Sequence, residues 1–322
     1  MMEAQVAAQF CFPHLLNISC RKPVSRSRLV LLNILVSSVS LLTVTLNLLV
    51  IVSVSRFRQL HTPTNVLLLS LAVSDFLVGL VLLPGEIFRK TSCWFLGDLM
   101  CSLYKFVASL TISASIGDLI LISAERYVAI CDPLRYPTRV TVPRVRSCVL
   151  LCWFCSVLYS CVFVKSGVTE PDGDNSCYGE CAIIVDFVTG SVDIVVSFIL
   201  PVSAIVVLYM RVFVVAVSQA RSMRSLVRAA TLHGSVCVTA KRSELKAART
   251  LGVLVLVFLI CFCPYYCVSL AGGAVLNASY VIYLFYLNSC LNPVIYTLFY
   301  PWFRRAVKLI VTCRILQPGA VG

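Results

Sequence analysis

Seven long apolar stretches limit the possible folds of this chain more than any other feature of its sequence. They cover roughly residues 29–55, 65–88, 98–131, 147–166, 184–216, 245–271 and 279–300. A helix needs about 20 mainly apolar residues to cross the hydrocarbon core of a bilayer, and each stretch is long enough. Of the 322 residues, 59% are apolar and only 13% are charged, which is too little charge for the surface of a soluble protein. The sequence therefore predicts an all-α membrane protein, a seven-transmembrane helix bundle built as one domain.

The positions of the basic residues indicate how these helices are oriented. They gather in one set of connections and in the C-terminal tail: Arg56, Arg58, Arg135, Arg139, Arg144, Arg146, Arg221, Arg224, Arg228, Lys241, Arg242, Lys246, Arg304, Arg305, Lys308 and Arg314. By the positive-inside rule that side is cytoplasmic, so the N-terminus is outside. We expect an extracellular tail (1–28), a seven-transmembrane domain (29–300), and a membrane-surface helix with a short cytoplasmic tail (301–322). Topology accounts for the net charge of +13, so no nucleic-acid partner is expected.

The seventh stretch ends in NSCLNPVIYTLFYPWFRRA, which carries polar residues that a lipid-facing anchor would lack. Pro293 has no N–H and is expected to kink the helix, while Asn288 and Asn292 can satisfy backbone groups that the kink leaves free. After Tyr300, the run PWFRRAVKLIV separates an apolar face from Arg304 and its basic neighbours. This pattern predicts a short amphipathic eighth helix along the membrane surface, in contact with lipid.

Six of the 17 cysteines lie outside the membrane or at its outer rim, where disulfides persist: Cys11, Cys20, Cys93, Cys101, Cys177 and Cys181. A bond between Cys101 and Cys181 would tie the long outer loop over the bundle. Cys177 would then pair with Cys20, the partner we expect, or with Cys11; sequence alone cannot decide this. Asn17-Ile-Ser19 in the outer tail predicts glycosylation at Asn17.

Few ionisable residues lie inside the apolar stretches, and such residues are functional candidates because they are costly in a membrane. Asp75 lies mid-span in the second stretch. Ser115, Asn288 and Asn292 could converge on it as an oxygen-lined site for a sodium ion. The alternative is a hydrogen-bonded structural carboxylate. No other cofactor or metal is expected.

A charged motif closes the third stretch on its cytoplasmic side. Glu125-Arg126-Tyr127 precedes AICDPLRYP, and Arg126 could pair with Glu244 at the inner start of the sixth stretch. Such a pair would hold the two helix ends together until activation separates them. On charge alone, a positive-inside anchor is the preferred explanation of Arg126.

Together, these residues resemble the rhodopsin-like (class A) G-protein-coupled receptors, with one mark on each helix in order. The marks are Asn47, Asp75, Cys101, Glu125-Arg126-Tyr127, Trp153, Pro201 with Tyr209, Cys261-Phe-Cys-Pro264 and Asn292-Pro293-Val-Ile-Tyr296. The pattern NSxxNPxxYxxxYxWFRxA, the outer tail FCFPHLLNISCRKP and the run CYGEC are similar to the trace amine-associated receptors, which in fish form a large set of olfactory amine receptors. The resemblance implies an amine ligand and a stimulatory heterotrimeric G protein of the Gs/Golf type that raises cAMP. It also implies a location in the plasma membrane of olfactory cilia, with Pro264, Asn292, Pro293 and Tyr296 taking part in switching.

One departure from aminergic receptors bears directly on the ligand. Those receptors carry an Asp 18 residues before the Arg of the motif, and here that position is Ala108. The fifth stretch carries Asp193 instead, with Ser197 one turn further on. Because a branch of fish trace amine receptors keeps an acid in the fifth helix after losing the one in the third, the resemblance implies that Asp193 binds the amine. The alternative is a salt bridge between Asp193 and Lys105.

Aromatic residues of the sixth and seventh stretches are candidates to surround the ammonium group through cation–π contacts. They are Phe262, Tyr265, Tyr266 and Tyr286, although Phe262 stands where this class usually has Trp. Glu86, near the outer mouth, is a candidate for a second amino group.

Other functions are weighed against the same residues. A non-olfactory aminergic neurotransmitter receptor fits less well because of Ala108, and a secondary transporter of organic cations would need two related halves. His14, His61 and His233 meet no acidic cluster inside the bundle, so no catalytic site is expected. The tail after Lys308 is short and lacks a Ser-rich ending, which leaves arrestin binding open.

Overall fold

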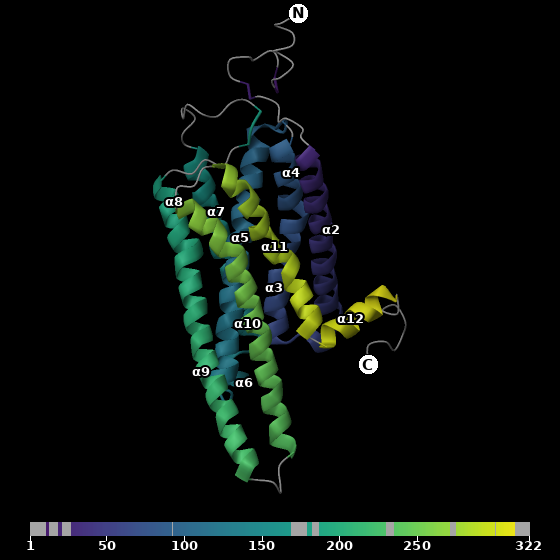
Figure 1. The fold of residues 1–322 in the computed structure, drawn as a ribbon, viewed down its shortest axis with the longest axis vertical. Helices are drawn as coiled ribbons and strands as arrows, with labels where there is room; N and C mark the ends of the chain where they lie inside the picture. Colours follow the sequence, from purple (N-terminus) through teal and green to yellow (C-terminus); the bar gives the residue numbers. More distant parts are fainter. Residues whose placement is uncertain are drawn as a thin grey trace, which may run out of the picture.

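The computed structural model describes residues 11–12, 19–20, 27–91, 93–168, 179–181, 187–229, 235–270, 275–299 and 301–312. Within these ranges every regular element is a helix, and the long helices run side by side along the long axis of the molecule (Figure 1). Six of them are long and apolar enough to cross a membrane, and a seventh contains the shorter apolar segment Val281–Ile295. The predicted seven-transmembrane bundle is confirmed.

Seven rods and several short helices make up the bundle. The rods are α2 (Ser27–Arg56); α3 (Pro63–Leu77) with η2 (Val78–Leu82) and α4 (Leu83–Thr91); α5 (Gly97–Cys131); α7 (Val142–Val168); α8 (Phe187–Asp193) with η3 (Ile194–Ile199) and α9 (Leu200–Ala229); α10 (Ser235–Leu270); and α11 (Val275–Phe299). Short helices η1 (Arg58–Leu60) and α6 (Tyr136–Arg139) lie in connections, and α12 (Pro301–Val311) follows the last rod.

The outer surface of this bundle is apolar, unlike that of a soluble helical protein. Large apolar side chains such as Leu31, Leu151 and Val162 are 62–70% exposed on the outer surface, where lipid would cover them. Polar residues are buried among the apolar core residues: Asp75 and Asn47 are fully enclosed between the helices. The interior therefore holds the hydrogen-bonded network, and the outside supplies the apolar surface that a bilayer requires.

Two rods contain a π-helical stretch just before a proline. The first, η2, ends two residues before Pro84, and the second, η3, ends two residues before Pro201. A proline lacks an N–H and its ring clashes with the carbonyl of the residue four positions earlier, so a wider turn there relieves the strain. These breaks change the direction in which Glu86 and Asp193 project, because both lie on the outer side of the break.

The close contact between α5 and α7 depends on a glycine. A Cβ atom added to Gly117 would lie 2.3 Å from the Sγ atom of Cys152, which is far inside van der Waals contact. Glycine at this position lets the two helices approach. The next residue of α7 is Trp153, whose Nε1 donates a hydrogen bond of 2.9 Å to the Oγ of Ser70 on α3.

Two disulfides connect the outer parts of the chain, Cys101–Cys181 and Cys11–Cys93. The first is the bond expected over the bundle. Cys20 is also disulfide-bonded, but its expected partner Cys177 lies outside the described residues, as does Asn17. Because Cys11 pairs with Cys93, the alternative in which Cys177 takes Cys11 is wrong.

The last helix, α12, lies across the end of α2 (Figure 1). Phe303 and Ala306 are only 1% and 4% exposed and pack inward, while Arg304 and Arg305 are exposed. This is the amphipathic division that the sequence predicted.

Candidate ligand-binding site

A cavity of about 100 Å³ lies between α5, α7, the α8–η3 rod, α10 and α11. Its wall consists of charged, hydroxyl-bearing and aromatic side chains: Lys105, Ala108, Ser109, Ile112, Ser113, Tyr159, Phe163, Asp193, Ser197, Tyr265, Tyr266, Ile282, Phe285 and Tyr286. Six of the eight residues predicted to bind ligand are on this wall, including Ala108. Glu86 and Phe262 are not.

Asp193 is the acid of this cavity. The hydroxyl of Tyr159 donates a short hydrogen bond to its Oδ1, and the Oγ of Ser197 donates to the same oxygen at 2.9 Å. A further bond of 3.3 Å joins Ser197 to the Tyr159 hydroxyl, so the three groups form a closed triangle. Among the described residues none donates to Oδ2. The carboxylate is thus held in one orientation with one oxygen still able to accept a cationic donor.

Lys105 lines the same cavity without joining this triangle. The alternative interpretation predicted a salt bridge from Lys105 to Asp193, but no ion pair links them in the structure. Ala108, one turn further along α5, is buried and leaves this wall without an acid. The cavity therefore contains an anion and a cation that do not neutralise each other directly.

The aromatic side chains form a continuous cluster beside the cavity. Phe285, which sequence reasoning missed, has its ring centroid 4.1 Å from that of Phe262 and 5.3 Å from that of Tyr265. Tyr266 stacks on Phe198 at 4.5 Å. Phe262 is 3% exposed and contacts the cluster from outside the cavity wall, so it supports the wall and does not form it.

Tyr159 was also missed, because nothing in the run VLYSC distinguishes a tyrosine that orients a carboxylate from one that packs. Its partner Asp193 is 34 residues away in the sequence. Only the approach of α7 to α8 reveals the contact.

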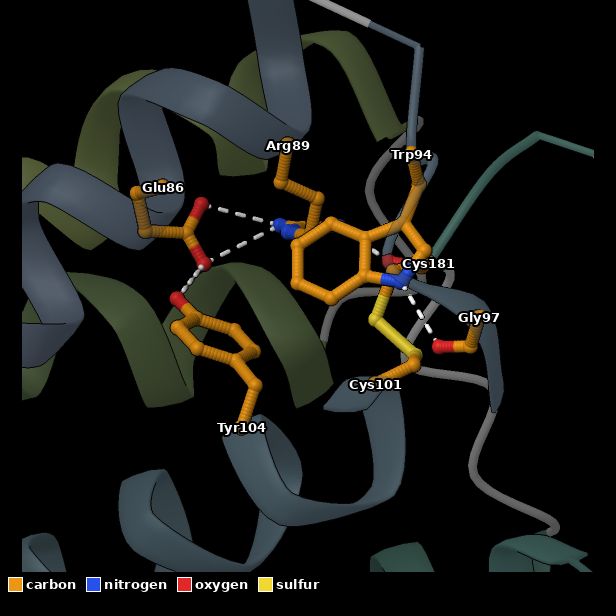
Figure 2. Close-up of a disulfide and its surroundings, with 7 residues drawn as sticks. All are labelled: Glu86, Arg89, Trp94, Gly97, Cys101, Tyr104 and Cys181. Atoms are coloured by element: carbon orange, nitrogen blue, oxygen red, sulfur yellow. Dashed lines mark hydrogen bonds and ion pairs between the residues drawn. A yellow bond between two sulfur atoms is a disulfide. The ribbon is translucent and has the colours of Figure 1, made fainter. Parts of the chain in front are cut away.

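Glu86, the residue predicted to bind a second amino group, is surrounded by partners from its own chain in this structure. It is fully buried, and the Nη2 of Arg89 donates to both of its carboxylate oxygens, at 2.9 and 3.2 Å. The Tyr104 hydroxyl donates at 2.8 Å, and the Lys90 Nζ lies 3.6 Å away. Figure 2 shows Arg89 and Tyr104 pointing toward the carboxylate from different helices.

The same arginine connects this cluster to the outer loop. Its Nη1 donates to the backbone carbonyl of Cys181 at 3.3 Å, beside the Cys101–Cys181 disulfide (Figure 2). Arg89 therefore joins the second rod to the loop that covers the bundle.

The start of α5 lies close to this disulfide (Figure 2). Gly97, its first residue, has a φ of 76°, a conformation that favours glycine. The Gly97 carbonyl accepts a hydrogen bond from Trp94 Nε1 at 3.0 Å.

Deeper in the bundle, Asp75 lies in a group of buried polar side chains. The Nδ2 of Asn292 donates to Asp75 Oδ2 at 2.8 Å, and Asn288 on α11 and Ser115 on α5 are also buried. Within the described part of the chain, Asp75 Oδ1, Asn288 Oδ1 and Asn292 Oδ1 have no hydrogen-bond partner, and no hydrogen bond joins Ser115 to Asp75. Buried oxygens without donors are what a hard cation would coordinate, so these residues fit sodium.

Asp118 is a second buried acid that the sequence interpretation overlooked. The Oγ of Ser70 donates to its Oδ2 at 2.8 Å, and Ser70 in turn accepts the bond from Trp153. Asp118 Oδ1 has no partner among the described residues. Asp118 could have been identified from the sequence, because it lies mid-span like Asp75 and an ionisable residue inside a membrane helix is a functional candidate.

At the other end of α5, Arg126 pairs with its neighbour Glu125, with 2.7 Å between Nε and Oε2, and donates a short bond to Thr64 Oγ1. Tyr136 donates to Glu125 Oε1 at 2.5 Å, and burial together with this bond raises the pKa of Tyr136 to about 12, which keeps it a neutral donor. The side chain of Glu244 lies outside the described residues.

The remaining switch candidates are placed on their helices. Pro264 lies inside α10 and Pro293 inside α11, where Asn292 is buried. Tyr127 is partly exposed, and the side chain of Tyr296 lies outside the described residues. The structure thus joins Asn292 to Asp75 and Arg126 to Glu125.

Known proteins match this chain along almost its whole length. Residues 46–296 match the 7 transmembrane receptor (rhodopsin family). Trace amine-associated receptor 13c of Danio rerio is 37% identical over 97% of this chain and 95% of its own, and trace amine-associated receptor 1 of Mus musculus is 38% identical over 88% and 89%. Trace amine-associated receptor 8a of Rattus norvegicus is 36% identical over 98% and 95%. These relatives are receptors, which removes the enzyme and transporter alternatives. The chain belongs to the trace amine-associated receptors, within the rhodopsin family of seven-transmembrane receptors.

Proposed function

We propose that this receptor is activated by protonated amines and that Asp193 pairs with the ammonium group. The observation that carries the proposal is the Asp193 carboxylate on the cavity wall, oriented through Oδ1 by Tyr159 and Ser197 while Oδ2 accepts no bond from the described residues. A buried carboxylate without a full set of partners is expensive in a membrane, and an organic cation would remove much of that cost.

The aromatic wall supports the same ligand. Tyr265, Tyr266 and Tyr286 line the cavity, and a cation over a tyrosine ring gains roughly 0.5–2 kcal/mol from each favourable contact. The absence of an acid at Ala108 means that the cation is held from the α8 side, not from α5. The ligand thus contacts the rod that contains η3 and the rod that contains Pro264.

Binding is expected to shift the receptor between two states. A near-complete shift requires the ligand to prefer the active state by about 5.5 kcal/mol. Pro264 would be the pivot of α10, and movement of its inner end would separate Glu244 from Arg126 and admit a G protein. Sodium at Asp75, Asn288 and Asn292, with Ser115, would stabilise the resting state. Tyr127, Pro293 and Tyr296 complete the switch.

The G protein in this proposal is of the stimulatory Gs/Golf type, with cAMP as the signal. The N-terminus is outside, residues 1–28 form the outer tail, Asn17 is glycosylated, and the receptor lies in the plasma membrane of olfactory sensory cilia. The basic residues of the connections support this orientation.

A cAMP assay with a panel of amines tests the amine site. Asp193→Asn keeps the shape of the side chain and one acceptor oxygen but removes its charge. Losing a buried charge pair costs about 2–5 kcal/mol. We expect potency to fall by roughly 100-fold for every active amine. Asp98→Asn, which removes an exposed acid at the start of α5, is the matched control and should leave potency unchanged. Unchanged potency of Asp193→Asn, at equal surface expression, would contradict the proposal.

A further inference from the structure

We propose that the preferred ligand is a zwitterion, a molecule with an ammonium group for Asp193 and a separate carboxylate for Lys105. This inference rests on the proposed amine site. It adds a second charge-recognition point, on a different helix, and it names the chemical class of the ligand as an amino acid whose two charged groups are separated by an apolar body.

The first observation is that the cavity wall carries one group of each sign. Lys105 comes from α5 and Asp193 from α8, and both line the same cavity. Lys105 is partly buried and forms no ion pair with any carboxylate in the described part of the chain. A partly buried ammonium group facing a binding cavity is best satisfied by an anion on the ligand.

The second observation concerns where a second ammonium group would go. The other acid near this end of the bundle, Glu86, already accepts bonds from Arg89 and Tyr104 and has Lys90 at 3.6 Å. It is fully buried and does not line the cavity. A diamine held by Asp193 would therefore bring its second charge toward Lys105 without meeting a free acid, and like charges repel.

The third observation is the apolar part of the same cavity wall. Ile112, Ile282 and Phe285 line the cavity with Lys105 and Asp193. Apolar and aromatic side chains favour a hydrocarbon linker, since burying it removes apolar surface from water. An ammonium group, a hydrocarbon body and a carboxylate together match the chemistry of this wall.

Three matched ligand series test the inference on the full-length receptor by cAMP signalling. They are n-alkylamines, ω-amino acids and α,ω-diamines with two to six methylene groups. In the wild type we expect, for at least one chain length, an ω-amino acid about tenfold more potent than the alkylamine of that length, because a hydrogen bond to a charged group has that effect. The diamine should be the weakest of the three.

Variants of Lys105 identify the group responsible. Lys105→Gln should abolish the advantage of the amino acid and leave alkylamines as potent or more so. Lys105→Arg keeps the charge and should retain the advantage. Lys105→Glu should reverse the ranking, so that the diamine becomes the most potent of the three.

The two proposals fail in different ways. If Asp193→Asn weakens alkylamines but Lys105→Gln leaves the ratio of amino acid to alkylamine unchanged, the zwitterion inference is overturned and the amine site stands. The zwitterion inference is also overturned if, in the wild type, no ω-amino acid is more potent than the alkylamine of the same length. If no ligand depends on Asp193, the amine site itself is wrong. Surface expression measured in parallel identifies variants that fail to fold. If Lys105→Gln fails to fold, the ranking of the three ligand series on Lys105→Arg decides the result.

Discussion

Replacing Glu86 with glutamine should destabilise the receptor strongly, because Glu86 balances two cations at the outer end of the bundle. Its carboxylate is fully buried and accepts bonds from Arg89 Nη2 at 2.9 and 3.2 Å and from Tyr104 at 2.8 Å. Glutamine keeps the size of the side chain and one acceptor oxygen. It removes the charge that compensates Arg89, whose side chain is only 16% exposed.

The expected loss is about 3 kcal/mol, the low end of the 3–5 kcal/mol measured when one partner of a buried ion pair is removed. The low end applies because the exposed part of Arg89 keeps some contact with water. At roughly 2–4 °C per kcal/mol for a large domain, the melting midpoint should fall by about 6–12 °C. Thermal unfolding of detergent-purified receptor, followed by a thiol-reactive dye, measures this shift.

A double variant separates charge balance from packing. Glu86→Gln with Arg89→Gln removes both charges, so it should melt above either single variant, and the coupling should be about 0.5–3 kcal/mol. Asp98→Asn, at an exposed acid, should shift the midpoint by little. A Glu86→Gln midpoint within the scatter of the wild type, or a double variant whose loss equals the sum of the single losses, would refute the reasoning.

Two further predictions concern the interior. Sodium chloride should raise the melting midpoint above that in choline chloride at equal ionic strength, because an ion that binds only the folded state stabilises it. Asp75→Asn should abolish this difference. Equal midpoints of the wild type in the two salts would argue against the sodium site. Gly117→Ala should lower the midpoint, because the new Cβ would lie 2.3 Å from Cys152 Sγ, and adding Cys152→Ala should recover most of the loss, which a melting assay of the pair would reveal.

The rods could be predicted from the sequence because crossing a bilayer depends on each segment alone. Length and apolar content were enough to predict α7, although only 11% of its most apolar part is buried inside the protein. The π-helical breaks could not be predicted in this way. They arise from the fit of a proline-containing turn against its neighbours, and only their prolines, such as Pro84 and Pro201, are visible in the sequence.

The candidate site could be predicted where the identity of a single residue was unusual for its position. Asp193 stood out as an acid in an apolar helix, and the absence of an acid at Ala108 stood out against the family. The partners of these residues depended on helix packing: Tyr159 on α7 and Phe285 on α11 have no sequence feature that marks them. The sequence interpretation also missed the ion pair of Glu86, although Arg89 lies three residues later on the same helix and an ion pair at that spacing could have been expected.

The bond between Cys11 and Cys93 restricts how the outer tail can be altered in the laboratory. The two residues are 82 positions apart, so the beginning of the chain is attached to the rim of the bundle well before the first rod starts. A tail deletion that removes Cys11 would leave Cys93 as a free thiol in the secretory pathway, open to exchange with other thiols and to retention there. Epitope tags and export leaders therefore belong ahead of residue 11, and shortened tails need both cysteines replaced together.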